Sequence, residues 1–446
     1  MNTPICDFVK AYTATDALRL HMPGHKGVSF LGMESLDITE ITGADSLYEA
    51  GGIIAQSEAN ASKLFDCPTY YATEGSSQCI RGMLQLVSLY ACAQGKKPRI
   101  AAGRNAHKAF ISAVALLDID VQWLYSQTQT SYLSCELSAQ SVDAFLRQQQ
   151  ELPTAVYLTS PDYLGKLADI AGIADVCHKY GVLLAVDNAH GAYLHFLPES
   201  QHPMDLGADL CCDSAHKTLP VLTGGAYFHI SSTFPEEIAR QTKNVMMLFG
   251  STSPSYLILQ SLDAANPYLQ THRARLESFL PQVCALKRRL SQKGYSLYGD
   301  EPMKLTVSAK AYGYTGTQLA QLLEKKNIVP EFADPDYLVL MLTPETGIEG
   351  LRRLEQTLLE IPQKEEIMET PPVFAPAKKV LSVREAMLSH GQILPASQCL
   401  GKILAHPGVG CPPAVPILIC GEQIDRHALE CFAYYGITEC CVVRNP

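Results

Sequence analysis

The chain has 446 residues, of which 47% are hydrophobic and 18% charged, values typical of a soluble globular protein with two or three domains. Its formal net charge of −10 argues against nucleic acid and against an anionic membrane surface as partners. No apolar run reaches the roughly 18 residues of a membrane helix, and residues 1–20 lack the order of a signal peptide. The fifteen cysteines show no C-x-x-C spacing, so we expect reduced, mostly buried thiols in a cytoplasmic protein.

Between residues 73 and 230, short apolar runs each end in a polar turn that a helical stretch follows. These runs lie at 99–102, 154–159, 182–187 and 208–212, and a Gly/Ser turn at 74–77 opens an amphipathic helix before them. Apolar strands that alternate with helices predict a mostly parallel sheet with both faces covered. In such sheets ligands bind beyond the carboxyl ends of the strands, where these polar turns lie.

The second half of the chain has a different pattern. Residues 301–345 predict a smaller α/β unit, with strands at 303–309 and 336–344 and a helix at 315–328. Four prolines within 362–378 predict a linker, so that the remaining residues would form a small C-terminal domain.

Two residues that suit a cofactor follow neighbouring strands of the predicted sheet. Asp187 ends the strand at 182–187, and Lys217 follows the strand at 208–212. Taken alone, Asp187 is compatible with a helix-capping carboxylate and Lys217 with a solvated surface lysine. At the ligand edge of a sheet, the same residues would supply a carboxylate that partners a cation and an amine that forms a Schiff base.

Two helix openings supply further candidates. Gly75, Ser76 and Ser77 open a helix whose free N–H groups suit an anion, although an ordinary serine cap looks the same. His107 stands early in the next helix, as a core or surface histidine or as a ring stacked on a planar ligand. An anion site, a carboxylate, a lysine and an imidazole together indicate a pyridoxal phosphate site. No H-E-x-x-H or Cys/His ligand set is present, so we predict no metal site.

The order of the motifs resembles that of the ornithine/lysine/arginine decarboxylase family, whose members are pyridoxal phosphate enzymes of fold type I. The motifs are "LHMPGHKG" (20–27), "TEGSSQ" (73–78), "GRNAHKA" (103–109), "LTSPDYLG" (158–165), "VDNAHGAY" (186–193), "DSAHKTLPVLTGG" (213–225), "STSPSYLILQSLD" (251–263) and "GKILAHPGVGCPPAVPILICGEQI" (401–424). The resemblance is nearly end to end, and the set is specific although each motif alone is not.

The resemblance implies an α/β, aspartate-aminotransferase-like fold with a mostly parallel seven-stranded sheet in its large domain. We expect an N-terminal arm at 1–50, a large cofactor-binding domain at 51–265, a small α/β domain at 266–365 and a C-terminal domain at 366–446. The regulatory N-terminal domain of the family's long bacterial members is expected to be missing. A cytoplasmic homodimer with active sites at its interface is also implied.

The resemblance further assigns roles to single residues. Lys217 would bind the aldehyde of pyridoxal phosphate, Asp187 would pair with the pyridine nitrogen, and His107 would stack on the ring. The other implied cofactor contacts are Gly75, Ser76, Ser77 and Ser214 at the phosphate, Ala189 beneath the ring, His216, Ser160 and His190 close by, and Thr252 and Ser253 at the phosphate of the neighbouring subunit. The Gly pair 224–225 would let the chain turn back close to the site.

The implied activity is decarboxylation of lysine, arginine or ornithine to CO2 and the corresponding amine. Four residues depart from the family's pattern: His406 replaces a usual glutamate, Cys411 a tyrosine, Ala414 a glycine and Glu74 a common asparagine. Two alternatives stay open, namely an enzyme of the same fold with another amino-acid substrate, and a catalytically weak regulatory or binding relative. We interpret Arg81, Arg99 and Arg104 as surface or strand-end charges rather than as a site for a second carboxylate.

Overall fold

A computed structural model describes residues 1–126, 131–373, 375–407 and 413–444 of the chain. It divides into two compact units that each combine segments distant in the sequence. The first unit contains residues 1–98, 154–156 and 170–276, and the second contains residues 99–153, 157–169 and 277–446.

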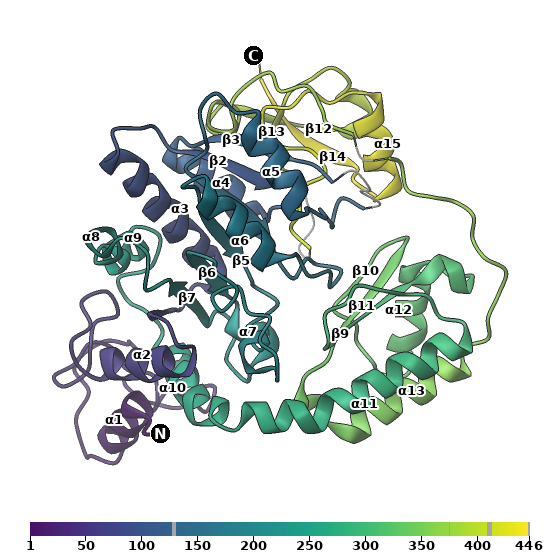
Figure 1. The fold of residues 1–446 in the computed structure, drawn as a ribbon. Coiled ribbons are helices and arrows are strands. Elements are labelled where there is room, and N and C mark those ends of the chain that lie inside the picture. Colours follow the sequence, from purple (N-terminus) through teal and green to yellow (C-terminus); the bar gives the residue numbers. More distant parts are fainter. Residues whose placement is uncertain (127–130, 374, 408–412, 445–446) are drawn as a thin grey trace. The chain divides into compact units, whose positions relative to one another are not determined.

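The largest sheet has seven strands in the order β1-β7-β6-β5-β4-β2-β3 (Figure 1). Its strands are β1 (Thr69–Ala72), β2 (Arg99–Gly103), β3 (Asp120–Leu124), β4 (Ala155–Thr159), β5 (Leu183–Asp187), β6 (Leu210–Asp213) and β7 (Ala226–Ile230). The pairs β2–β3 and β5–β6 are parallel, whereas β7 runs antiparallel to both of its neighbours, β1 and β6. The predicted mostly parallel seven-stranded sheet is confirmed.

The first unit also contains helices, some of which pack on its part of the sheet. The helices are α1 (Pro4–Thr13), α2 (Ile53–Leu64), α3 (Gly75–Ala93), α6 (Ile170–Lys179), α7 (Ala215–Thr218), α8 (Glu236–Ala239), α9 (Thr242–Met247) and α10 (Tyr256–Leu269), with a 3-10 turn η1 at Leu194–Phe196. Helix α3 packs against β1, β5, β6 and β7, and α6 packs against β5. Helices α1, α2 and α10 pack on one another (Figure 1). Aromatic side chains such as Phe65, Tyr71 and Tyr227 fill this core and are fully buried.

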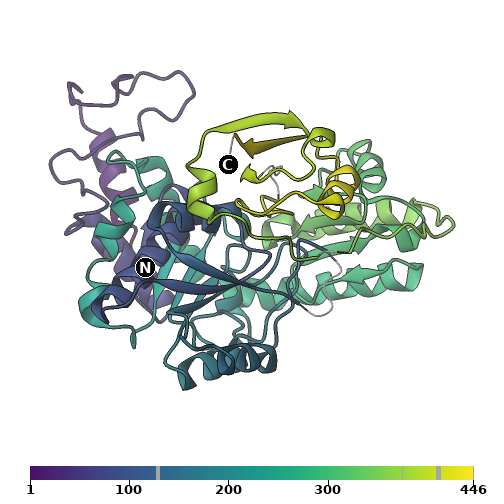
Figure 2. The ribbon, with the colours of Figure 1, turned by 90° about the horizontal axis from the view of Figure 1, so that it is seen from above.

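The second unit adds two smaller sheets. One has the order β10-β11-β9-β8, and the other the order β12-β14-β13. Their strands are β8 (Leu297–Tyr298), β9 (Lys304–Ser308), β10 (Phe332–Ala333), β11 (Tyr337–Met341), β12 (Gly391–Pro395), β13 (Leu404–His406) and β14 (Glu439–Val443). Figure 2 shows the three-stranded sheet in yellow-green and yellow, near the C-terminal end of the chain.

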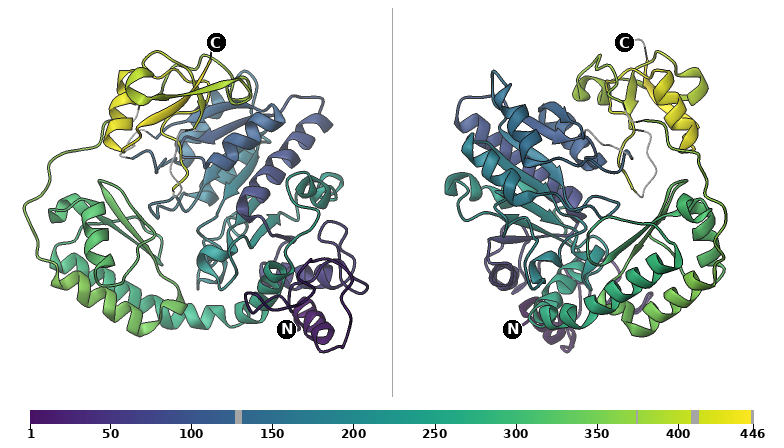
Figure 3. Two further views of the ribbon diagram at one scale, coloured as in Figure 1. Left: turned by 180° about the vertical axis from the view of Figure 1, so that it is seen from behind. Right: turned by 45° about the vertical axis from the view of Figure 1, so that its right-hand side comes forward.

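The second unit also contains helices. They are α4 (Lys108–Leu117), α5 (Ala139–Arg147), α12 (Gly316–Glu324), α13 (Gly347–Glu360), α14 (Val383–Met387) and α15 (Arg426–Tyr434), with 3-10 turns η2 (Ala309–Tyr312), η3 (Pro344–Thr346) and η4 (Ala396–Gln398). Helix α12 packs on β10 and β11, and α14 packs on β13. Helix α11 (His272–Lys293) begins in the first unit and continues in the second. Residues 362–373 after α13 contain neither helix nor strand, and Figure 3 shows the extended course of this stretch.

The core of the second unit joins elements of the two small sheets. Leu164, Val339, Leu404, Ile417 and Val442 belong to one buried hydrophobic cluster, which ties the four-stranded and three-stranded sheets together. Apolar burial of this kind contributes roughly 25 cal/mol per Å² and is the main reason why short strands such as β13 form at all.

The state of the cysteines and the length of the apolar helices were both considered in the sequence. Fourteen cysteines lie within the described residues, and all of them are free; eight are buried, four are half-buried, and two, Cys92 and Cys284, are exposed. Among the described helices, none combines the length and the apolar character needed to cross a membrane.

Candidate active site

Asp187 and the segment that carries Lys217 lie at the same end of two adjacent parallel strands. Asp187 is the last residue of β5, and it pairs in register with Cys212 of β6. Its side chain is 3% exposed, and its Oδ1 accepts the N–H of Ala189 at 3.1 Å. Strand β6 ends at Asp213, and α7 with Lys217 follows at once. The strand pattern therefore brings both residues to one edge of the sheet, as the sequence predicted.

The amine of Lys217 has a histidine partner from the turn after β5. Its Nζ lies 3.0 Å from Nε2 of His190, a residue that is 5% exposed. A contact of this length between an amine and an imidazole requires one proton between the two nitrogens. His190 can therefore accept a proton from Lys217 or return one to it.

The Gly/Ser turn before α3 meets the segment after β6. The hydroxyl of Ser214 donates to Oγ of Ser76 at 2.7 Å, and the N–H of Gly75 donates to the carbonyl of Gly224 at 2.7 Å. Gly75 has a φ of +72°, a conformation that costs glycine little. Ser76 and Ser77 stand in the first turn of a helix of 19 residues, where N–H groups point outward and favour an anion.

Glu74 has a structural partner that the sequence did not reveal. Its Oε1 accepts the N–H of Ser251 at 2.5 Å, so the carboxylate ties the Gly/Ser turn to the segment before α10. Thr252 and Ser253, which lie in that segment, are exposed.

The glycine pair allows a close approach of the backbone. A Cβ on Gly224 would lie 2.8 Å from the carbonyl oxygen of Thr73, and Gly224 has a φ of +98°. The backbone N–H of His216 donates to the carbonyl oxygen of Gly225 at 3.2 Å. The ring nitrogen Nδ1 of His216 lies 3.1 Å from the same oxygen. The predicted turn close to the lysine segment is therefore confirmed.

The remaining candidates, His107 and Ser160, belong to the second unit. His107 caps α4, because its Nδ1 accepts the N–H of Ala109 at 3.1 Å. The hydroxyl of Ser160 accepts the N–H of Ala168 at 3.0 Å. Their part in a cofactor site stays a prediction.

The interpretation of Arg104 as a surface charge is wrong, although it does follow strand β2. Its side chain is 2% exposed and donates to the carbonyls of Pro416 at 3.0 Å and Ile417 at 2.8 Å. It also lies 3.5 Å from a carboxylate oxygen of Glu422. Arg104 therefore anchors the segment 416–422 inside the second unit.

Three departures from the family's pattern lie in the C-terminal segment. His406 ends β13 with an exposed side chain. Ala414 has a φ of +56°, the left-handed conformation that favours the glycine expected there. Cys411 lies outside the described residues.

Sequence reasoning missed a buried network of hydrogen bonds next to the segment that carries Lys217. Asp213, the residue before Ser214, accepts hydrogen bonds from Asn188, His202 and His229. One sequence signal was present, since Asp213 ends an apolar strand as Asp187 does.

Comparison with known proteins agrees with this architecture. Residues 3–296 match the family described as "Orn/Lys/Arg decarboxylase, major domain". The chain is 28% identical to the arginine decarboxylase of Bacillus subtilis (strain 168), a match that covers 96% of this chain and 92% of that protein. It is also 28% identical to the uncharacterized protein YaaO of the same organism, over 96% of this chain and 93% of that one.

Solved structures support the fold. The lysine decarboxylase LdcF of Francisella novicida superposes with a TM-score of 0.81 at 16% identity, over 99% of this chain and 81% of that one. The constitutive lysine decarboxylase of E. coli gives a TM-score of 0.75 at 17% identity, over 99% and 82%. The predicted aspartate-aminotransferase-like fold is thereby confirmed. With two thirds of its length matched by the family's major domain, the chain belongs to the Orn/Lys/Arg decarboxylase family.

Proposed function

We propose that this protein is a pyridoxal phosphate enzyme that decarboxylates a basic amino acid. The observation that carries the proposal is the arrangement at the ends of β5 and β6, where the Nζ of Lys217 lies 3.0 Å from His190, with Asp187 on the adjacent strand. Membership of the Orn/Lys/Arg decarboxylase family gives the reaction class.

The residues of the first unit fit this cofactor. The first turn of α3, with Ser76 hydrogen-bonded to Ser214, is suited to the phosphate because its N–H groups and hydroxyls favour an anion. A buried carboxylate, Asp187, suits a protonated pyridine nitrogen, and the amine of Lys217 suits the aldehyde. In the second unit, His107 and Ser160 are proposed as a ring platform and a further contact.

Several residues of the protein would each have a separate role in the decarboxylation. When bound, pyridoxal phosphate supplies the electron sink that accepts the electron pair of the breaking Cα–carboxylate bond. Asp187 would keep the positive charge at the ring nitrogen, because a buried carboxylate stabilises a nearby cation. His190 would hold or release the proton at Nζ of Lys217, and Lys217 or a histidine would supply the proton that Cα takes up. His216 is proposed to line the site next to the lysine.

The proposal also covers the oligomeric state of the protein, its location in the cell and its division into domains. Thr252 and Ser253 are exposed and would reach the phosphate site of a neighbouring subunit, which makes a homodimer with shared active sites. The products would be amines of polyamine metabolism, formed in the cytoplasm. The four-part division at residues 50, 265 and 365 likewise stays a proposal.

The substrate would be lysine, arginine or ornithine. His406 is the observation that favours an alternative, since a glutamate is usual at that position and a carboxylate would recognise a distal ammonium or guanidinium group. An enzyme of the same fold that acts on another amino acid is therefore the second candidate, and a weak regulatory relative is the third.

The test is to identify amine products by mass. The purified protein is incubated with pyridoxal phosphate and, separately, with lysine, arginine, ornithine and several neutral amino acids. We expect one basic amino acid to yield its amine, and Lys217→Ala to abolish the product. Lys179→Ala is the matched control, because Lys179 also follows a histidine but lies at the end of α6. An amine formed only from a neutral amino acid would establish the second candidate, and no amine from any of them would support the third.

A further inference from the structure

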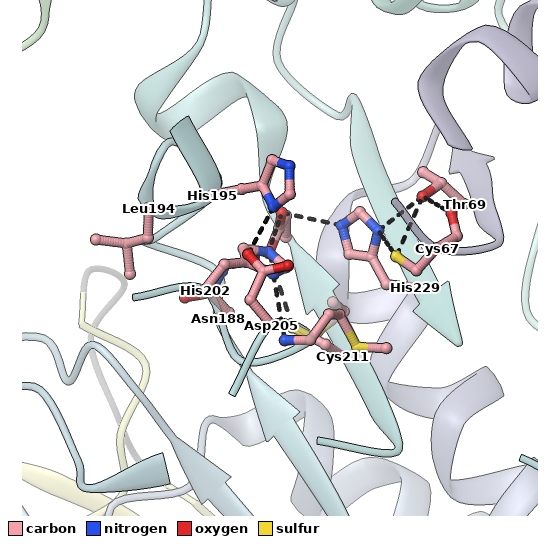
Figure 4. A network of polar contacts seen from close by, with 12 residues as sticks. Cys67, Thr69, Asn188, Leu194, His195, His202, Asp205, Cys211 and His229 are labelled. Atoms are coloured by element: carbon pink, nitrogen blue, oxygen red, sulfur yellow. Dashed lines mark hydrogen bonds and ion pairs between the residues drawn. The ribbon is translucent and has the colours of Figure 1, made fainter. Parts of the chain in front are cut away.

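The buried carboxylate of Asp213, at the end of β6, is the centre of a hydrogen-bond network, and Figure 4 shows its partners Asn188, His202 and His229. Asp213 accepts the amide N–H of Asn188 at 2.6 Å, and Nε2 of His202 and Nε2 of His229 lie 3.1 and 3.0 Å from its Oδ2. All four residues are 0% exposed. A carboxylate withdrawn from water at this depth persists only if several donors satisfy it, and here three do.

The protonation of this cluster follows from its geometry. Burial opposes ionisation of Asp213, but the charge and hydrogen bonds of His202 and His229 outweigh burial and hold its pKa well below the usual range. Burial, only partly offset by Asp213, lowers the pKa of His202. The cluster is therefore an ionised aspartate that accepts hydrogen bonds from Nε2 of His202 and Nε2 of His229.

The network reaches four strands of the first unit. Asp213 ends β6, Asn188 follows β5, and His229 lies in β7. Nδ1 of His229 lies 2.9 Å from the hydroxyl oxygen of Thr69 in β1. Strands β1, β5 and β6 lead directly into the Gly/Ser turn, the Asp187 turn and the lysine segment.

We propose that Asp213 is a positioning residue that fixes the spacing between the Asp187 turn and the lysine segment, and thereby the affinity for the cofactor. Asp213 has Ser214 as its chain neighbour, and its partner Asn188 has Asp187 as its own. The hydrogen bond between Asn188 and Asp213 therefore links the chain next to Asp187 with the chain next to Ser214. The inference rests on the proposed function, because it assigns Asp213 a role toward the same cofactor.

Gly191 shows how closely the orientation of Asn188 is fitted. A Cβ at Gly191 would lie 2.0 Å from Oδ1 of Asn188 and 2.6 Å from Cδ1 of Leu194. We therefore expect Gly191→Ala to displace the Asn188 amide without replacing Asp213 itself. This gives a second way to disturb the same hydrogen bond.

A metal ion is the competing explanation for the cluster. One ligand atom each of His202, Cys211 and Asp213 lie within 4.8 Å of one another. The geometry favours hydrogen bonding, because Nε2 of His202 already points at the carboxylate that would share the metal, and Cys211 Sγ lies 3.9 Å from it as a weak donor. Burial and nearby carboxylates keep the Cys211 thiol protonated, since its pKa is raised well above the usual value.

The experiment measures the affinity of the apoprotein for pyridoxal phosphate by equilibrium dialysis, with the circular dichroism of the bound cofactor as a second readout. Asp213→Asn removes the charge and places an amide among three donors. Hydrogen bonds to charged groups are strong enough that we expect a Kd raised about ten- to a hundredfold and a changed cofactor dichroism. Gly191→Ala should act in the same direction. Thr69→Val, an isosteric change at the outer end of the network, should raise the Kd by about two- to fivefold.

Asp263→Asn is the matched control. Asp263 is also 0% exposed and accepts backbone N–H groups of Ile5 and Cys6 at 2.9 Å, so its replacement tests a lost buried charge elsewhere in the unit. We expect its cofactor affinity to stay near that of the unmodified protein, even where its thermal midpoint falls as much as that of Asp213→Asn. If Asp213→Asn does not fold, Gly191→Ala and Thr69→Val decide the question.

Several outcomes would overturn the inference. Folded Asp213→Asn or Thr69→Val protein with unchanged cofactor affinity and dichroism would do so while the proposed function stood. Stoichiometric zinc in the unmodified protein that disappears in Asp213→Asn would replace positioning by metal binding. If the unmodified protein bound no pyridoxal phosphate, the proposed function would fall, and this inference with it.

Discussion

Asp334→Asn should stabilise the protein at neutral pH, although it removes a charge. Asp334 lies between β10 and β11 and is 6% exposed. Its Oδ1 accepts the N–H groups of Asp336 at 2.8 Å and Tyr337 at 2.6 Å, whereas its Oδ2 has no hydrogen-bond partner among the described residues. Burial raises the pKa of Asp334 from 3.8 to about 6, and the charge of Asp336 adds to this effect. The backbone hydrogen bonds lower the pKa but do not outweigh burial.

The size of the effect follows from this pKa. One pH unit corresponds to about 1.4 kcal/mol, so ionising Asp334 in the folded protein costs about 3 kcal/mol more than in the unfolded chain. Because the folded pKa is the higher one, the folded state binds more protons between pH 3.8 and about 6. The unmodified protein therefore loses stability as the pH rises through this window, and asparagine avoids that loss.

The assay is urea or thermal unfolding of both proteins at several pH values. We expect Asp334→Asn to be more stable by about 1–3 kcal/mol at pH 8 and the difference to vanish toward pH 4. Asp336→Asn should act in the opposite direction at pH 8, because its carboxylate accepts the Tyr434 hydroxyl at 2.6 Å and pairs with Lys310 at 3.1 Å. A difference that is independent of pH, or a less stable Asp334→Asn at pH 8, would refute the reasoning.

Two further predictions concern the second unit. Asp118→Gly should raise the free energy of unfolding in urea by about 0.5–1 kcal/mol. Asp118 ends α4 with a φ of +53°, a conformation that favours glycine, and its carboxylate makes a surface contact of 3.9 Å to Arg384. Arg104→Met should lower the free energy of unfolding by about 3 kcal/mol and expose segment 416–422 to proteolysis, because Glu422 would be left buried without its cation. Arg99→Met, whose ion pairs with Asp120 and Glu151 lie at the surface, should change it by less than about 1 kcal/mol. An equal loss in both arginine variants would contradict the buried anchor.

The sequence predicted the parallel part of the large sheet well. Strands β2, β4, β5 and β6 agree with the expected runs to within a few residues, since a strand covered on both faces appears as a continuous apolar run. The antiparallel direction of β7 was not foreseen, because hydrophobic periodicity carries no information on strand direction. The elements of the C-terminal sheet were not predicted either, since β12 is largely exposed and its pairing with β14 joins residues about fifty positions apart.

The site was predictable where it depends on strand ends and less so where it depends on pairing across the fold. Asp187, Ser214 and Lys217 follow apolar runs, and the motif order of the family placed them. The partners of Asp213 lie 11, 16 and 25 residues away, in the loop before β6, in β7 and in the turn after β5, so that only the folded sheet brings them together. Arg104 was misread for the same reason, since its carbonyl partners lie more than 300 residues further along the chain.

The distribution of thiols gives the protein a built-in labelling scheme. Reaction with maleimides needs the thiolate, and burial raises the pKa of the thiols of Cys6 and Cys67 to about 12. Among the thiols that the structure describes, two are exposed, one in each compact unit: Cys92 at the end of α3 and Cys284 in α11. With Cys411 replaced by serine, a donor dye and an acceptor dye attached to these two thiols would report the separation of the units by energy transfer.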